Sequence, residues 1–191
     1  MKKSYGVYLD APHKDHLEVI NHRDAIQYVE EIVQSKESLS EWQIKNLHRL
    51  VLKGIDDEYA GVYRKEQVFI SGAKHVPPAP YSVQDKIDRM MSWYLSESDK
   101  LHPVERGAML HAIFVGIHPF IDGNGRTARL LLNLELMKAG YPPIDIKFTD
   151  QVSYYNAFDD YYEKHKLGKM EKLFASYVNA RLDNYLKILI E

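Results

Sequence analysis

A run of twelve residues concentrates the side chains of this protein that could do chemistry. It reads HPFIDGNGRTAR, from His118 to Arg129. His118 has an ordinary pKa of about 6.5, which allows proton transfer close to neutral pH. Asp122 is a hard oxygen ligand of the kind that Mg²⁺ uses when phosphates and waters complete its shell. A general base and a metal-binding carboxylate therefore lie within one short segment.

The second half of the same run has the features of an anion-binding site. Gly123 and Gly125 allow close approach of the backbone to a ligand and positive φ angles. If a helix begins here, its first N–H groups lack partners within the helix and can bind an anion. Asn124 can add a side-chain donor. Arg126 and Arg129 share one helix face, where they can hold terminal phosphates. Together with the base and the carboxylate, these features predict nucleotidyl transfer.

A simpler interpretation of the run is a corner between two helices. In it, Asp-Gly-Asn-Gly supplies turn residues, His118 caps a helix and the arginines are solvated. We favour the chemical interpretation because five separately useful polar groups follow one another between two apolar helices.

Helical patterns surround this run on both sides. Apolar residues recur at helical spacing, and Pro, Ser and Gly stand at suitable ends. Trp42 is one member of the apolar stripe in the second helix. The helix before His118 is apolar nearly all round and should lie at the centre of a bundle. The expected helices are 12–34, one from Ser38 or Ser40 to about Gly54, 82–95, 103–117, one after the loop to Lys138, 150–165 and 169–190.

One stretch has a different pattern. Gln67 to Ile70 is a short β-prone run and Ser71-Gly72 is a turn signal, so we expect a small hairpin between Tyr63 and Val76. The prolines at 77, 78 and 80 forbid regular structure immediately afterwards. The predicted fold class is mainly α with one small β-hairpin, in a single domain of 191 residues.

Composition excludes several classes of protein. Apolar residues make up 45% and charged residues 27%, a globular balance. The net charge of −2 and the lack of a basic block argue against nucleic acid as the main partner. There is no cysteine, which excludes disulfides. The N-terminus lacks the apolar region of a secretory signal, and no apolar run reaches the ~20 residues of a membrane span. We expect a cytoplasmic protein with no membrane partner.

The run from His118 to Arg129 resembles the signature of the Fic (filamentation induced by cAMP) family, H-x-F-x-D/E-G-N-G-R-x-x-R, and matches every specified position. The stretches 47–49, 60–64, 77–78, 139–143 and 153–155 are similar to the family as well. The resemblance covers about residues 18–165, and the helix at about 169–190 follows it. It implies a Fic-type helical bundle with a hairpin flap beside the active-site loop.

The AMP-transferring branch of this family moves AMP from ATP to a Ser, Thr or Tyr hydroxyl of a target protein and releases pyrophosphate. The resemblance implies that His118 deprotonates the hydroxyl and that Asp122 binds Mg²⁺. It assigns ATP contacts to the stretch Asp122, Gly123, Asn124, Gly125, Arg126, Thr127, Ala128 and Arg129, and to Tyr154 and Tyr155 beside the adenine. The two tyrosines could equally be core residues. His111 is expected to be a buried core histidine, and Glu135 to be solvated or paired, with no catalytic role.

The expected hairpin corresponds to the family's flap, which pairs with an extended stretch of the target protein. The docking residues would be Val68, Phe69, Ile70, Ser71, Gly72, Ala73 and Lys74. Strand addition of this kind aligns a hydroxyl through backbone hydrogen bonds.

One family feature is missing. Many relatives inhibit themselves with a helix of pattern S/T-x-x-x-E-G/N, whose glutamate pairs with the second arginine of the signature, here Arg129. No Ser or Thr of this sequence has Glu four residues on. The brake is then a separate inhibitory protein, an upstream segment, or absent, and no glutamate of this chain should pair with Arg129.

Three alternatives to AMP transfer remain open from the sequence. The first is removal of AMP from a modified target, which in this family uses the missing glutamate. The second is transfer of another phosphate-containing group, which the presence of Gly125 disfavours. The third is a non-catalytic module that binds peptides at the flap, against which the intact His118 and Asp122 argue.

Overall fold

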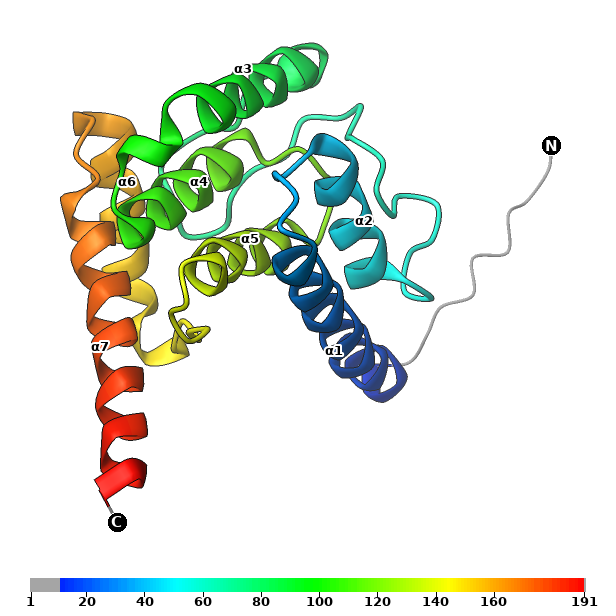
Figure 1. Cartoon of the computed structure of the whole chain (residues 1–191). Helices are drawn as coiled ribbons and strands as arrows, with labels where there is room; N and C mark the ends of the chain where they lie inside the picture. The colour runs from blue at the N-terminus through cyan, green and yellow to red at the C-terminus, as the bar shows by residue number, and fades with distance from the viewer. Residues whose placement is uncertain (1–10, 191) are drawn as a thin grey trace, which may run out of the picture.

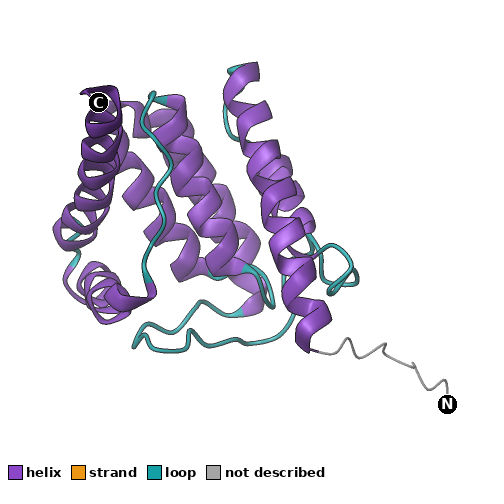
Figure 2. Ribbon diagram, turned by 90° about the horizontal axis from the view of Figure 1, so that it is seen from below, coloured by secondary structure: helices purple, strands orange, loops and turns teal. Residues whose placement is uncertain are grey.

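A computed structural model describes residues 11–190 of the chain. These residues form seven α-helices and three short 3₁₀ turns, with no strand among them (Figures 1 and 2). The mainly α prediction is confirmed. Residues 1–10, which include most of the stretch in which we expected no secretory signal, lie outside the described part. None of the helices in residues 11–190 is both long and apolar enough to cross a membrane.

Two helices at the centre carry the chemistry-bearing run between them. These are α4 (Pro103–Ile117) and α5 (Asn124–Lys138), which pack against each other along their length. Ten residues of α4 are buried, on every side of the helix, so the prediction that it lies at the centre of the bundle is confirmed. Burial of this kind contributes about 1.5–3 kcal/mol for each large apolar side chain. The loop His118–Gly123 therefore joins two firmly held helices.

The other helices cover this pair from two sides (Figure 1). On one side, α1 (Ala11–Ser35) and α2 (Glu41–Leu52) pack on α5. On the other side, α3 (Val83–Ser96) and α6 (Gln151–Lys164) contact α4. The last helix, α7 (Gly168–Ile190), packs against α4 and α6 and then extends away from the bundle.

Local signals explain where these helices begin. Ser40 caps α2: its side chain accepts from the Gln43 N–H, and the Gln43 side chain accepts from the Ser40 N–H. This reciprocal capping box satisfies two N–H groups that a helix start leaves free. Trp42, placed in the apolar stripe of this helix by the sequence, is instead exposed. The buried face of this helix consists of Gln43, Ile44, Leu47, His48, Val51 and Leu52.

The predicted β-hairpin is wrong. In the flap (residues 65–78), the one backbone–backbone hydrogen bond is the turn from Ala73 N–H to the Ile70 carbonyl. The side chain of Gln67 bridges the two arms instead, donating to the Pro77 carbonyl at 3.0 Å. Pro77 and Pro78 have no N–H to give to a ladder. The β-prone residues 67–70 are therefore irregular chain, with no strand opposite to pair with them.

Candidate active site

His118 stands at the end of α4 in a left-handed backbone conformation, with φ of 49°. Its Nδ1 lies 3.1 Å from the Val115 carbonyl, so Nδ1 carries the proton and donates it there. Nε2 is then the unprotonated nitrogen, and no described residue binds it. Burial lowers the pKa of His118 below its ordinary value, and the nearby Arg64 adds to this effect. At neutral pH the imidazole is therefore a neutral base with a free lone pair.

The strained backbone at His118 is held by Arg64, a buried arginine that precedes the flap. Its Nε donates to the His118 carbonyl at 2.8 Å, and its backbone N–H donates to Pro119 at 2.9 Å. The other guanidinium nitrogens donate to the carbonyls of Glu66 and Pro78, at 2.9 and 2.5 Å. One side chain thus fixes both ends of the flap to the position of the base.

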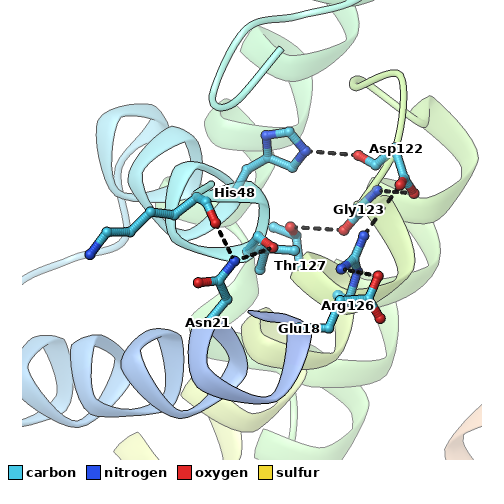
Figure 3. Close-up of polar contacts among 9 residues, drawn as sticks. Glu18, Asn21, His48, Asp122, Gly123, Arg126 and Thr127 are labelled. Atoms are coloured by element: carbon cyan, nitrogen blue, oxygen red, sulfur yellow. Dashed lines mark hydrogen bonds and ion pairs between the residues drawn. The ribbon is translucent and has the colours of Figure 1, made fainter. Parts of the chain in front are cut away.

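His48 of α2 fixes the loop from the other side. Its Nδ1 accepts from the Gly61 N–H at 2.8 Å, so its Nε2 must carry the proton and donate to the Asp122 carbonyl, also at 2.8 Å (Figure 3). The ring stacks on Phe120, with centroids 3.5 Å apart. Burial lowers the pKa of His48 to about 4, which keeps this tautomer neutral.

The loop is also closed on itself by Asn124, which is buried. Its side-chain oxygen accepts from the Phe120 N–H at 2.9 Å, and its amide nitrogen donates to the Phe120 carbonyl at 2.8 Å. The side-chain donor expected for a phosphate is therefore turned into the loop. Thr127, whose hydroxyl donates to the Gly123 carbonyl, and Ala128 are buried as well. What this stretch offers a ligand is the backbone N–H groups at the start of α5.

Asp122 and Arg126 lie at the open side of this helix start. Oδ1 of Asp122 accepts from the Gly123 N–H at 2.6 Å, and Oδ2 lies 3.4 Å from Nη2 of Arg126. Nη1 of Arg126 pairs at 3.1 Å with Glu18 of α1 (Figure 3). The Asp122 side chain is 56% exposed, and Arg126 is 19% exposed. A carboxylate and a guanidinium therefore face the same opening.

Arg129 follows one turn later and has a different environment. It lines a cavity of about 510 Å³ with His22 of α1, Asp145 and Lys147 after α5, and Arg181 of α7. Within residues 11–190 no carboxylate forms an ion pair with Arg129.

The two predicted adenine tyrosines lie side by side on α6, with ring centroids 5.3 Å apart. The hydroxyl of Tyr154 is 2.8 Å from Nε2 of His111, a fully buried histidine of α4, as expected for that residue. Tyr155 lies against the flap: a Cβ added to Gly72 would come within 2.8 Å of its ring. Gly72 also has φ of +88°, so glycine is the residue that fits there.

Helix α6 holds the flap at further points. The Lys74 N–H donates to Asp159 at 3.0 Å, and the Lys74 ammonium lies 3.5 Å from Glu163. The ring of His75 stacks on Tyr162 with centroids 3.7 Å apart, and its Nε2 is 3.0 Å from the Gly116 carbonyl. The flap residues Val68 to Lys74 are exposed or half-buried. The flap is thus an extended segment, anchored by side chains, whose own backbone groups are largely unpaired.

This arrangement suits transfer of a phosphorus group to a hydroxyl. The loop and the first turns of α5 carry a neutral base, a free helix start, two arginines and an exposed carboxylate. Within residues 11–190 no three or more His, Cys, Asp or Glu side chains form a cluster that could hold a metal ion alone. The single carboxylate of Asp122 suits Mg²⁺, which takes few protein ligands when phosphates and waters supply the rest.

Sequence reasoning assigned no role to four residues that build the site: Glu18, Asn21, His48 and Arg64. The stretches that contain His48 and Arg64 were marked only as similar to the family. All four lie far from the loop in sequence, and no spacing rule connects them to it. The sequence signal of His48 and Arg64 is weak, because each is only a polar residue on an apolar stretch without an evident partner.

Comparisons with known proteins agree with this geometry. The model of the Fic/DOC family matches residues 38–136. A curated relative from Nematostella vectensis, named protein adenylyltransferase Fic, is 45% identical over 143 residues, which are 74% of this chain and 33% of the relative. The chain thus spans about a third of the length of that relative.

Two solved structures extend the similarity to the fold. Fic-1 from C. elegans is 28% identical with a TM-score of 0.82, over 99% of this chain and 55% of that one. A Fic domain containing signaling protein from Bacteroides thetaiotaomicron is 30% identical with a TM-score of 0.73, over 92% of this chain and 70% of that one.

Proposed function

This chain belongs to the Fic/DOC family, and on that premise we propose that it transfers AMP from ATP to a hydroxyl of a target protein. The relatives named protein adenylyltransferase support the activity. The observation that carries the proposal is the free Nε2 of His118, beside the anion-binding start of α5.

His118 acts as the general base. The Ser, Thr or Tyr oxygen of the target attacks the α-phosphorus of ATP, its proton moves to Nε2, and the bond to the β-phosphate breaks to release pyrophosphate. The Val115 carbonyl stabilises the imidazolium that forms, because Nδ1–H already donates to it. The lowered pKa of His118 keeps it unprotonated before each turnover.

The nucleotide phosphates would lie at the start of α5. The backbone N–H groups of residues 123–126 and the helix dipole favour anionic oxygens there. Arg126 and Arg129 would hold the β- and γ-phosphates by charge-assisted hydrogen bonds. Tyr154 and Tyr155 would lie beside the adenine. Asp122 would hold Mg²⁺, which neutralises charge between the α- and β-phosphates.

The target protein would dock at the flap. An extended segment whose backbone groups are largely unpaired can accept an added strand, and its anchors on α6 hold it still. Backbone pairing is independent of target sequence, so the flap would align the hydroxyl while other contacts choose the protein. Phe69 is 74% exposed and would contact the target directly.

We also propose that any glutamate that restrains Arg129 comes from outside residues 11–190, such as from a separate inhibitory protein. Arg129 faces the cavity of about 510 Å³, which leaves room for an added side chain.

The test is a labelling experiment with the chain and His118→Ala. Each is incubated with α-labelled ATP, Mg²⁺ and a cell lysate. Label on a protein band that requires His118 supports AMP transfer, and mass spectrometry of that band identifies the residue. Label from γ-labelled ATP instead would point to phosphate transfer. Release of AMP from modified protein would point to the reverse reaction, and absence of any label would favour a peptide-binding module.

A further inference from the structure

The guanidinium of Arg126 lies between two carboxylates, one from Glu18 on α1 and one from Asp122 in the loop before α5 (Figure 3). Nη1 is 3.1 Å from Oε1 of Glu18 on α1, and Nη2 is 3.4 Å from Oδ2 of Asp122. Nη1 is buried. The proposed reaction gives Arg126 and Asp122 to different partners, a phosphate and a metal ion.

A tighter pair between Arg126 and Asp122 than the present contact at 3.4 Å would oppose both tasks. It would lower the negative charge that attracts Mg²⁺ and would turn the cation away from the phosphates. Asp122 lies in the loop two residues before α5, and Arg126 lies in the first turn of α5, so the two side chains are close enough to pair. In this structure their contact is the longer and more exposed of the two, and the shorter contact of Arg126 is the one with Glu18.

Glu18 lies on α1, a helix that its neighbours hold in place. One turn further along α1, Asn21 is buried and donates from its side chain to the Lys53 carbonyl at 2.7 Å and the Val51 carbonyl at 3.4 Å. These bonds dock α1 onto the end of α2, and α1 also packs along α5. The carboxylate of Glu18 therefore reaches Arg126 from a helix that packs against both α2 and α5.

We propose that Glu18 is a positioning residue: it draws Nη1 of Arg126 towards α1, limits the pair between Arg126 and Asp122 to the one contact at 3.4 Å, and so keeps the Asp122 carboxylate available for the metal ion. Glu18 also balances the charge of the guanidinium. The inference rests on the proposed function, because it assigns the metal and phosphate roles to Asp122 and Arg126. Without Glu18, the guanidinium moves towards the one carboxylate left to it.

The test compares Glu18→Gln with Glu31→Ala, which removes an exposed glutamate from the same helix. Calorimetric titration of Mg²⁺ into each chain, saturated with a non-hydrolysable ATP analogue, gives the dissociation constant of the metal. For E18Q we expect that constant to rise about fivefold, as for the loss of one partly exposed ion pair. E31A should match the unmodified chain. Thermal midpoints show that all variants are folded.

A second arm separates positioning from a general loss of structure. In the Arg126→Ala background, which keeps the Asp122 carboxylate, adding E18Q should change metal binding no further, because the cation that would occupy that carboxylate is gone. An unchanged metal constant in E18Q, or an equal loss in both backgrounds, overturns the inference.

The same measurements keep the two proposals apart. A chain that transfers AMP, but whose metal binding E18Q does not alter, refutes the role of Glu18 alone. A chain that shows the shift with E18Q, but transfers no AMP, refutes the proposed function alone.

Discussion

His118 combines a strained backbone with a defined tautomer. Non-glycine residues rarely adopt a positive φ, and such residues persist where their surroundings hold them. Here Arg64 holds the carbonyl of His118 and Val115 fixes Nδ1, so Nε2 is directed by two independent contacts. The histidine itself was found from sequence, whereas its tautomer and Arg64 required the structure.

Replacement of His118 by Ala should lower kcat for AMP transfer at least about 100-fold, since it removes the general base. ATP binding, measured by calorimetry, should change little, because the proposed phosphate site is at the start of α5 and not at His118. In the unmodified chain, activity should fall with acid only below pH 6.5, because burial lowers the pKa of His118. An acid limb centred above pH 6.5 in a kcat profile would contradict this assignment.

His48 should make stability depend on pH. Its pKa is about 4 in the folded chain and about 6.5 when unfolded, so between these values the unfolded chain binds more protons. Its contribution is complete above pH 6.5 and is lost as pH falls towards 4. Between pH 7 and 5 this loss is about 2 kcal/mol. Urea denaturation of His48→Gln should show a pH dependence smaller by about that amount.

His111 serves as the comparison for that measurement. Burial also lowers its pKa to about 4, but it contacts Tyr154 rather than the loop. The pH effect on stability should shrink in His111→Gln as well. AMP transfer at neutral pH should fall more in H48Q, because His48 bonds to the Asp122 carbonyl.

At the scale of elements, the sequence predicted the helices within about two residues. Apolar spacing of 3.6 and end signals such as the Ser40 capping box are local, so they can be read without knowing the fold. The flap was predicted wrongly because β-propensity reports a pleated, half-buried surface rather than a partner. Its real anchors, on α6, come from residues more than 80 positions away.

The hydrogen bond from the Lys74 N–H to Asp159 can be tested against the neighbouring ion pair between Lys74 and Glu163. Asp159→Ala removes the acceptor for the Lys74 N–H, so the flap loses a fixed point and the KM for the target protein should rise about tenfold. Lys74→Ala removes only an exposed ion pair and keeps that N–H, so its effect should be small. Steady-state kinetics with varied target give both values. Equal effects would mean that the charge, rather than the backbone bond, holds the flap.

At the scale of the whole molecule, a buried ion pair ties three helices together. Glu135 of α5 is fully buried, pairs with Arg106 of α4 at 2.6 Å and accepts from the Tyr94 hydroxyl of α3, also at 2.6 Å. The sequence left open whether Glu135 is solvated or paired, and the structure shows that it is paired. The pair lies at the far end of α5 from the catalytic loop.

Glu135→Ala should lower the free energy of unfolding by about 3 kcal/mol, because it leaves Arg106 with only its pair to the exposed Asp99. Pairing it with Arg106→Met should recover much of that loss, since no unpaired charge remains. Urea denaturation measures both variants. Glu97→Ala, which breaks an exposed pair with Lys100, is the control and should cost less than about 1 kcal/mol. A double variant no more stable than E135A would contradict this account.

The hydrogen bonds by which Asn124 closes the loop should affect the kinetics of nucleotide binding. Both hydrogen bonds to Phe120 come from the side chain of Asn124, and His48 donates to the Asp122 carbonyl, so the protein's own groups hold the loop. The loop therefore needs no contact from ATP to keep this shape. Rapid-mixing experiments should show one exponential phase whose rate rises linearly with nucleotide concentration, without the plateau that a rate-limiting rearrangement imposes.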